Sequence, residues 1–451
     1  MGDVIDDSRH DRDFIDGTEA VVRLGSMLLS AGTGAYRVKH AMARAAEAIG
    51  MDRHDASVSL TEIITTTHKG DNFRTVVREV PRVAVDASRI GALERLARAL
   101  PDGSTARELE DQLDHIARHV RGRWPWWVNM LAAGIACAAF AVLNHFSLTD
   151  AVLVFFGAAC GQGVRRALAK RGINQFGTAA LAAATASSVY LLLTLACRTI
   201  PWHVLHGVDG TGYVAAILFL IPGFPMITSI LDIARLDFTA GLPRAFYALA
   251  IILSAGAAAW AVSLATGLQP LVPGAELTGV LWWVGNAAAT FVGICGFAVM
   301  FNSTRTMMLR AAIAGMVANM MRLYAQRIGM PTQMASLVGG FVVGMLAWML
   351  AKNNDLPRIT LSVPGAVIMV PGTSMYRTMY WFNAHDITQS LAYGTDALVG
   401  VMALAAGLAV ARMCTDPGWT MVRWRRSPHA FLSSDAEFAK RDIDYSAPSD
   451  E

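Results

Sequence analysis

The most constraining feature of this 451-residue chain is a central stretch, residues 124–414, that carries very little charge. Those residues hold 15 Lys or Arg and 8 Asp or Glu, whereas residues 1–123 hold 18 and 20. An ordinary soluble domain carries about 25% charged residues. Because so few charges suit lipid better than water, the sequence predicts a membrane domain between two polar ends.

Composition also excludes several classes of protein. The formal net charge is only +3, and no dense Lys/Arg tract is present, so nucleic acid is not expected as a partner. The five cysteines lie singly in or beside apolar segments, without CxxC spacing, so neither disulfides nor a zinc site are expected. The polar N-terminal region contains no metal motif and no nucleophile elbow. We therefore expect no cofactor, no metal and no enzymatic activity.

Ten apolar segments can each cross the hydrocarbon layer, which takes about 20 residues per helix. Lys and Arg collect in alternate loops between them, which is typical of loops that face the cytoplasm. This pattern places both termini in the cytoplasm. The opposite loops hold only Arg198, Arg322, Arg327 and Arg377, and the pair Arg322 and Arg327 departs most from the pattern. The predicted spans are 125–144, 150–165, 177–197, 213–233, 241–266, 277–300, 306–324, 331–351, 363–381 and 389–412.

Residues 18–123 are predicted to form a small soluble α+β domain. Apolar residues recur at helical spacing on both sides of a turn at 31–34. β-branched stretches at 56–67 and 73–80 flank a turn at 69–72, and helices are expected at about 86–100 and 104–120. The polar ends, 1–17 and 428–451, are expected to be disordered.

The membrane region contains an internal repeat with an offset of 149 residues. Pro222-Gly223 falls on Pro371-Gly372, and Asp237 falls on Asp386. Two five-helix halves follow, at 124–268 and 275–413. Because five is odd, the second half enters the membrane from the opposite side, so the repeat is inverted. This architecture is typical of secondary transporters, whose substrate site lies between the halves.

Proline and glycine interrupt the fourth and ninth predicted helices at matching positions. Such breaks free backbone carbonyls and create a new helix N-terminus, which suits a carboxylate. Hydroxyl groups follow each break. The competing interpretation is a plain kink, with hydroxyls bonded to their own helix. The predicted substrate-binding residues are Pro222, Gly223, Thr228, Ser229, Pro371, Gly372, Thr373, Ser374 and Arg377.

Ionisable residues that lie inside the predicted spans include Asp232, Arg310, Arg377 and Asp396. Charge is costly there, so each is a candidate functional residue. Arg377 could clamp a carboxylate, and Asp232 or Asp396 could carry a proton. Alternatively, Asp232 ends a helix in water and Arg377 reaches the membrane surface.

Several motifs together resemble the bacterial threonine/serine exporter family. They are the run Leu28–Gly32 with Tyr36-Arg37-Val38, then Pro222-Gly223 with Asp237–Gly241, and Val370–Ser374 with Arg377. The resemblance covers roughly residues 18–412 and implies an inner-membrane exporter of L-threonine and L-serine driven by the proton motive force. It also implies ten helices after a soluble domain. The chain departs from the family pattern at Gly34 and Lys39, where acidic residues are expected.

Three functional hypotheses remain open at this point. The first is proton-coupled antiport of a small hydroxy amino acid, with lipid, protons and the substrate as the only partners. The second is export of a dicarboxylate such as succinate, which needs a second cation, and Arg310 is the candidate. The third is a membrane-tethered sensor or enzyme that acts through the N-terminal domain. Whether the chain forms a homo-oligomer is also left open.

Overall fold

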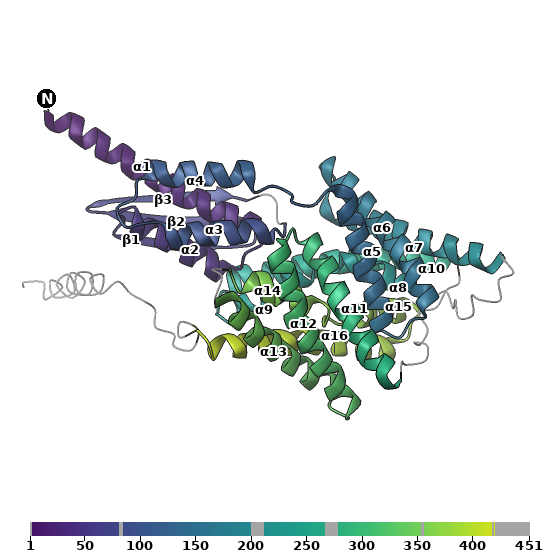
Figure 1. Cartoon of the computed structure of the whole chain (residues 1–451). Helices are drawn as coiled ribbons and strands as arrows, with labels where there is room; N and C mark the ends of the chain where they lie inside the picture. Colours follow the sequence, from purple (N-terminus) through teal and green to yellow (C-terminus); the bar gives the residue numbers. More distant parts are fainter. Residues whose placement is uncertain are drawn as a thin grey trace, which may run out of the picture.

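The computed structural model describes residues 2–80, 84–199, 212–266, 278–352, 356–416 and 419. The N-terminal elements form one body packed against one end of a helical bundle (Figure 1). That body contains α1 (Gly2–Ser30), α2 (Ala35–Ala48), β1 (Arg53–Val58), β2 (Glu62–Lys69), β3 (Asn72–Glu79), α3 (Ala87–Ala99) and α4 (Ala106–His119).

Helix α1 begins at Gly2, so the disorder predicted for residues 1–17 is corrected for the described part. Phe14 is 6% exposed and packs in the soluble core with Val21. Phe14 and Val21 are seven residues apart, which places them on one helix face. The apolar face of α1 thus starts one turn earlier than the sequence pattern suggested.

The three strands form an antiparallel sheet in the order β1-β2-β3. The stretch 56–67, predicted as one run, instead divides between β1 and β2, and the Ser59 N–H donates to the Glu62 carbonyl across the turn (2.8 Å). Residues 59–61 contain neither Gly nor Pro, so the turn carried no sequence signal. The turn at 69–72 lies where it was predicted.

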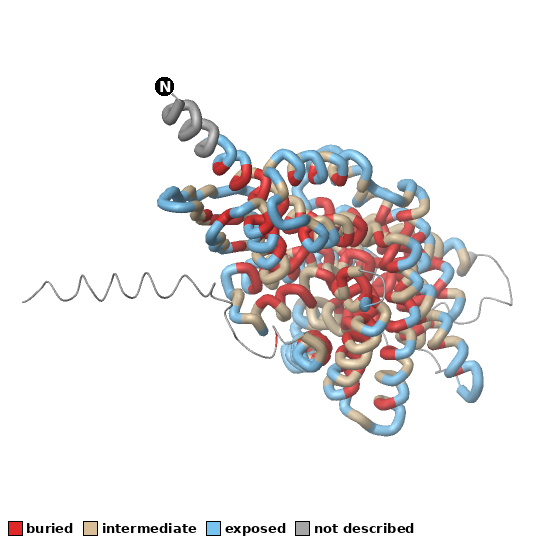
Figure 2. Tube along the Cα trace, turned by 60° about the vertical axis from the view of Figure 1, so that its left-hand side comes forward, coloured by how far each residue is buried: buried red, intermediate tan, exposed pale blue. Residues whose placement is uncertain are grey.

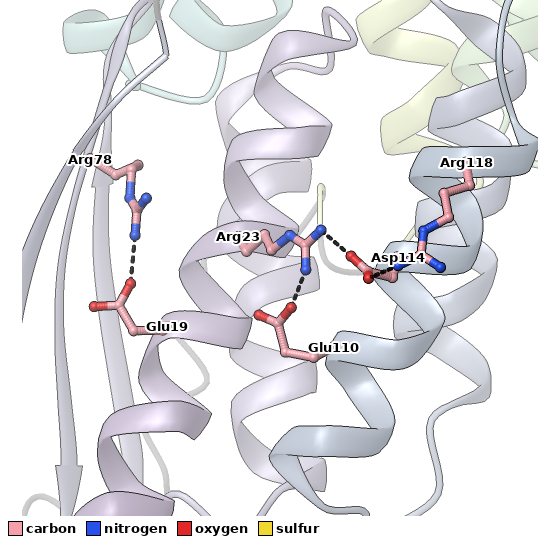
Figure 3. A network of polar contacts seen from close by, with 6 residues as sticks. All are labelled: Glu19, Arg23, Arg78, Glu110, Asp114 and Arg118. Carbon is pink, nitrogen blue, oxygen red and sulfur yellow. Dashed lines mark hydrogen bonds and ion pairs between the residues drawn. The ribbon is translucent and has the colours of Figure 1, made fainter.

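Ion pairs hold α1 between the sheet and α4. Glu19 pairs with Arg78 of β3, and Arg23 pairs with both Glu110 and Asp114 of α4 (Figure 3). Buried apolar residues of α1, α2, α3 and α4 form the core beneath these pairs. The N-terminal body thus has its own core.

The bundle contains α5 (Trp126–Leu143), α6 (Leu148–Lys170), α7 (Gln175–Thr199), α8 (Tyr213–Ala216), the 3-10 turn η1 (Leu218–Leu220), α9 (Gly223–Ile233), α10 (Phe238–Thr266), α11 (Gly279–Met300), α12 (Arg305–Arg327), α13 (Thr332–Lys352), α14 (Ile359–Val367), α15 (Gly372–Asn383) and α16 (Ile387–Met413). Buried residues concentrate along its centre (Figure 2). Large apolar side chains such as Leu192, Phe246 and Val280 are exposed on its outside, as expected for contact with lipid.

Within the described residues, seven helices are long and apolar enough to cross a membrane, or nine if each of two bent pairs counts as one span. The chain is therefore a multi-pass helical membrane protein. Of the ten predicted spans, α12 alone fails this test, although it is a 23-residue helix. The bent pairs are α8/η1 with α9 (55°) and α14 with α15 (50°), at the two predicted breaks.

Several elements of residues 124–268 match elements of residues 275–413. Helices α6 and α12 both have 23 residues, and Ser147 and Thr304, their N-caps, are 157 residues apart. The bent pairs correspond at the shift of 149, where Leu236 and His385 both have φ of 62°. The shift changes because the first half has a longer connection before its bent pair. Residues 200–211 of that connection and the tail 428–451 lie outside the described residues.

Candidate functional site

The two helix breaks contact each other at the centre of the bundle. A Cβ atom added to Gly223 would lie 3.3 Å from Cγ2 of Val367, just before the second break. A Cβ added to Gly372 would lie 2.6 Å from Cδ1 of Ile221, just before the first break. Pro222 and Pro371, which directly precede these glycines, therefore also lie where the halves meet.

The space around the breaks is filled by apolar side chains. Leu218, Phe224, Val363 and Val370 are each less than 4% exposed and belong to one core. In this conformation, the residues that meet at the breaks pack against one another. Any polar ligand there requires the halves to move apart.

The four predicted hydroxyls are each hydrogen-bonded within the protein. Thr228 Oγ1 donates to the Phe224 carbonyl of its own helix (3.0 Å), and Ser229 Oγ donates to the Gly241 carbonyl of α10 (2.8 Å). Thr373 Oγ1 donates to Asn144 Oδ1 (3.1 Å), and Ser374 Oγ donates to Asp396 Oδ2 (3.1 Å). Thr228 thus bonds within α9 and Ser229 joins α9 to α10, whereas Thr373 joins the second half to the first.

Asp232 lies where the N-terminal body meets the bundle, and it is 4% exposed. Its carboxylate accepts hydrogen bonds from the Ala35 N–H (3.1 and 3.3 Å) and from Arg244 Nη1 (3.0 Å). The Nη2 of Arg244 donates to the Thr33 carbonyl (3.2 Å). Beside this ion pair, Lys39 pairs with Asp237. The N-terminal body is thus held to α9 and α10 by a buried ion pair and by a second, partly exposed one.

A second contact fastens the N-terminal body to the corner between α11 and α12. Asn302 Nδ2 donates to Asp86 Oδ1 (2.9 Å), and Ser88 Oγ donates to the Asn302 carbonyl (2.5 Å). Burial raises the pKa of the Asp86 carboxyl above its ordinary value, although these hydrogen bonds oppose the shift. The N-terminal body therefore contacts the corner between α9 and α10 in the first half and the corner between α11 and α12 in the second.

Asp396 and Arg377 lie in the part of the second half that points away from the N-terminal body. Asp396 accepts from Gln333 Nε2 (2.9 Å) and from Ser374, and the Arg377 guanidinium lies 5.6 Å from the Tyr393 ring centre. Thr373 marks this end, because its partner Asn144 caps the far end of α5. The structure therefore separates Arg377 and Asp396 from Asp232, which lies at the opposite end.

Asp386 is the N-cap of α16, and its side chain accepts a hydrogen bond from the Gln389 N–H (3.0 Å). Arg310 donates to the Leu350 carbonyl (3.3 Å). Among the described residues, no group of three His, Cys, Asp or Glu could hold a metal ion.

A small cavity of about 20 Å³ lies next to Asp232. It brings Thr228 and Asp232 together with residues that the sequence reasoning did not assign to a site. Two of these residues are Arg412 and Trp419. The position of Arg412 at the end of the last span indicated only which side of the membrane that end faces, and nothing in the sequence pointed to Trp419. The cavity is lined by Gly34, Tyr36, Arg37, Thr228, Leu231, Asp232, Ile359, Arg412 and Trp419.

Sequence comparisons match both halves of the chain. A family model described as a threonine/serine exporter matches residues 19–267, and a second model with that description matches residues 286–414. No solved structure matches the chain.

Three curated relatives are similar to parts or most of the chain. The probable threonine/serine exporter of Mycobacterium tuberculosis is 23% identical over 91% of this chain and 78% of the relative. The threonine/serine exporter of Corynebacterium glutamicum is 22% identical over 90% of this chain and 82% of the relative. A probable succinate transporter subunit of Escherichia coli is 26% identical over 52% of this chain and 89% of the relative.

Proposed function

The chain belongs to the threonine/serine exporter family, and we propose that it exports L-threonine and L-serine by proton-coupled antiport across the bacterial inner membrane. The observation that carries the proposal is the contact between the two matched helix breaks. Gly223 and Gly372 each pack against the other pair, so motion between the halves would open the space at both breaks at once. A site at such an interface is typical of secondary transporters.

The proposed architecture is two inverted five-helix halves with both termini in the cytoplasm. It is supported by the directions of α5 and α11. The start of α5 lies beside the end of α11, because Trp124 Nε1 donates to the Ser303 carbonyl (3.0 Å). Corresponding helices therefore run in opposite directions relative to the N-terminal body. In this arrangement α12 also crosses the membrane, although its arginines make it more polar than the other spans.

In the proposed cycle, this conformation is closed toward the cytoplasm. The N-terminal body covers the Asp232 end of α9, and apolar side chains fill the space between the breaks. Release of the body and separation of the halves would expose Pro222, Gly223, Pro371 and Gly372. The free N–H groups at the start of α9 and of α15 would then be available to a substrate carboxylate. Thr228, Ser229, Thr373 and Ser374 are the proposed partners of its hydroxyl group.

Of the two candidate proton carriers, Asp396 is the better supported. Its hydrogen-bond partners, Gln333 and Ser374, are neutral, so protonation breaks no ion pair. Protonation of Asp232 would instead leave Arg244 buried with a neutral partner, and Arg244 is 2% exposed. Unpaired buried charge is costly. We therefore assign proton coupling to Asp396 and propose that Asp232 acts in opening the cytoplasmic side.

Export of a dicarboxylate is the second candidate, favoured by the similarity to the succinate transporter subunit over 52% of this chain. A dicarboxylate site needs two cations. Arg310 lies in the second turn of α12, whose start adjoins the N-terminal body, whereas Arg377 lies at the far end. Because these two cations lie toward opposite ends, the amino acid is the better candidate. The names of the relatives give no support to a sensor or an enzyme.

The test is efflux of preloaded radiolabelled L-threonine, L-serine or succinate from proteoliposomes that contain the full chain. We expect threonine and serine efflux that depends on an imposed proton gradient and stops when a protonophore collapses it. Efflux of succinate alone would support the second candidate. Threonine efflux that is insensitive to the proton gradient would refute proton coupling, whereas threonine would remain the proposed substrate.

A further inference from the structure

Three residues that line the small cavity beside Asp232 carry a buried hydrogen-bond donor without an acceptor. Among the residues that the structure describes, Arg37 Nε, Arg412 Nε and Trp419 Nε1 are buried without a hydrogen-bond partner. The nearest charge to Arg412 Nε is the Asp416 carboxylate at 3.6 Å, beyond hydrogen-bond length. Trp419 is 5% exposed. Buried polar groups are normally paired, so three such donors around one cavity indicate a missing acceptor.

The charge around these donors also favours binding of an anion. Arg37 is paired with Glu94 through Nη1 (2.7 Å), which leaves its Nε directed elsewhere. Arg412 interacts electrostatically with Arg37 and Arg358, and Asp416 and Glu94 are the acids that oppose them. Three guanidinium groups, of which Arg358 lies outside the lining of the cavity, thus interact with two carboxylates. The excess of positive charge and the N–H donors suit a carboxylate group.

The lining of the cavity also includes an acidic residue, Asp232, and the hydroxyl-bearing residue Thr228. The only N–H of the N-terminal body that reaches Asp232 within the described residues is the Ala35 N–H. A carboxylate has about four acceptor positions, so it can bind an ammonium group while keeping its bond to Arg244. The Ala35 N–H occupies the place that an ammonium donor would take.

We propose that this cavity is the cytoplasmic loading site for the zwitterionic head of an α-amino acid. The carboxylate binds the N–H donors of Arg37, Arg412 and Trp419, and the ammonium group replaces the Ala35 N–H on Asp232. The inference rests on the proposed amino-acid export and explains how the site would select an amino acid over a dicarboxylate. A dicarboxylate would bring its second negative charge to Asp232 and be repelled.

The size of the cavity adds a requirement for movement. A volume of about 20 Å³ admits roughly one water molecule and no amino acid. Gly34, Tyr36 and Arg37 belong to the N-terminal body, whereas the remaining lining residues belong to the bundle or follow it. Withdrawal of the turn at Gly34 and Ala35 would enlarge the cavity and free Asp232 in one step.

The test measures binding of radiolabelled L-threonine to the purified full-length protein, with unlabelled competitors. L-threonine methyl ester lacks the carboxylate, 3-hydroxybutyrate lacks the ammonium group, and succinate carries two carboxylates. We expect all three to compete at least tenfold more weakly than L-threonine, because each loses a charge-assisted contact. An ester or a succinate that competes as well as L-threonine would overturn the proposal.

Two variants tie that selectivity to the cavity. Trp419→Phe keeps the ring and removes the donor, and Arg412→Gln removes the charge; each should weaken threonine binding about tenfold. Trp283→Phe on the exposed surface of α11 is the matched control and should bind normally. Normal binding by both cavity variants, with threonine efflux intact, would refute the loading site and leave the proposed function standing. Absence of threonine binding and efflux in the unaltered protein would refute the function itself.

Discussion

The first broken pair, α8 with α9, and the second, α14 with α15, share a backbone geometry and differ in chemistry. Pro222 has φ −79° and ψ 59°, and Pro371 has φ −76° and ψ 63°. At the shift of 149 residues, however, Asp232 corresponds to Trp381 and Arg244 corresponds to Tyr393. One pair ends in a buried ion pair beneath the N-terminal body, and the other ends among aromatic residues at the far side.

This difference shows what the internal repeat preserves. Both halves keep the break, which sets the direction of two half-helices and brings Gly223 and Gly372 into the interface. The charged residues, by contrast, differ between the two broken pairs, according to what each pair contacts. Asp232 contacts the N-terminal body, whereas Asp396 accepts hydrogen bonds from two neutral groups of the bundle, Gln333 and Ser374.

The largest expected effect separates the two aspartates. Asp232→Ala leaves Arg244 buried without its anion, and we expect a loss of about 3–5 kcal/mol in the free energy of unfolding. Asp396→Ala removes bonds to neutral partners only and should cost about 1 kcal/mol. Denaturant unfolding of the purified protein measures both. Equal losses in the free energy of unfolding would contradict the claim that Asp232 has a charged partner and Asp396 only neutral ones.

A double variant sharpens that comparison. Asp232→Leu with Arg244→Met removes both charges of the buried pair. Replacing a whole buried ion pair with apolar residues is often close to neutral, so stability should return while threonine efflux stays impaired. Normal efflux in this variant would show that Asp232 is dispensable for transport.

The next effect compares the two glycines at the breaks. A Cβ at Gly372 would lie 2.6 Å from Ile221, whereas a Cβ at Gly223 would lie no closer than 3.3 Å to Val367. Gly372→Ala should therefore destabilise the protein by about 1–3 kcal/mol through overpacking, and Gly223→Ala by less. The same unfolding assay applies. A larger loss for Gly223→Ala would mean that the breaks do not meet as described.

A pH effect is expected within the N-terminal body alone. His54 is largely buried with Nδ1 near Thr67 Oγ1 (2.9 Å), and burial lowers its pKa to about 4. The unfolded chain binds the proton near pH 6.5, so stability falls as pH drops from about 6.5 toward 4, by about 1–2 kcal/mol at pH 5. Hydrogen exchange of β1 and β2 at pH 7.5 and pH 5 measures this change, and His54→Gln should reduce it. An unchanged pH dependence in that variant would assign the effect to another group.

The smallest effect concerns the ion pairs of Figure 3. The side chains of Arg23 and Glu110 are 36% and 35% exposed, so their pairing is well solvated. Arg23→Ala should therefore lower stability by less than about 1 kcal/mol and leave threonine efflux unchanged. A strong loss of efflux would give α1 a role that its position does not explain.

Much of the helical architecture was predictable because apolar runs, proline and glycine act locally. The two breaks, the turn at 69–72 and the cap at Asp386 all follow from neighbouring residues. The early start of α1 and the turn at 59–61 were missed. In the first case a single apolar residue, Phe14, extends the helix face, and in the second no turn residue marks the site.

The contacts around Asp232 were not predictable from sequence. Its partners Ala35 and Arg244 lie 197 residues before it and 12 residues after it, and only folding brings the turn before α2 to α9. Trp419 follows the last helix and gave no signal of its own. The departures from the family pattern at Gly34 and Lys39 gain a reason here. A Cβ at Gly34 would lie 2.8 Å from the Asp232 carboxylate, and Lys39 pairs with Asp237.

The most direct test of the account is to fix the N-terminal body on the bundle and measure export. Lys39→Cys with Asp237→Cys, in a background without Cys137, Cys160, Cys197, Cys295 and Cys414, places one thiol on each side of the contact. A short bis-methanethiosulfonate can then join them by forming a mixed disulfide with each thiol and releasing methanesulfinate, and dithiothreitol can reduce both disulfides. The account predicts that threonine efflux from proteoliposomes stops on cross-linking and returns on reduction. Efflux at the same rate in the cross-linked protein would contradict it.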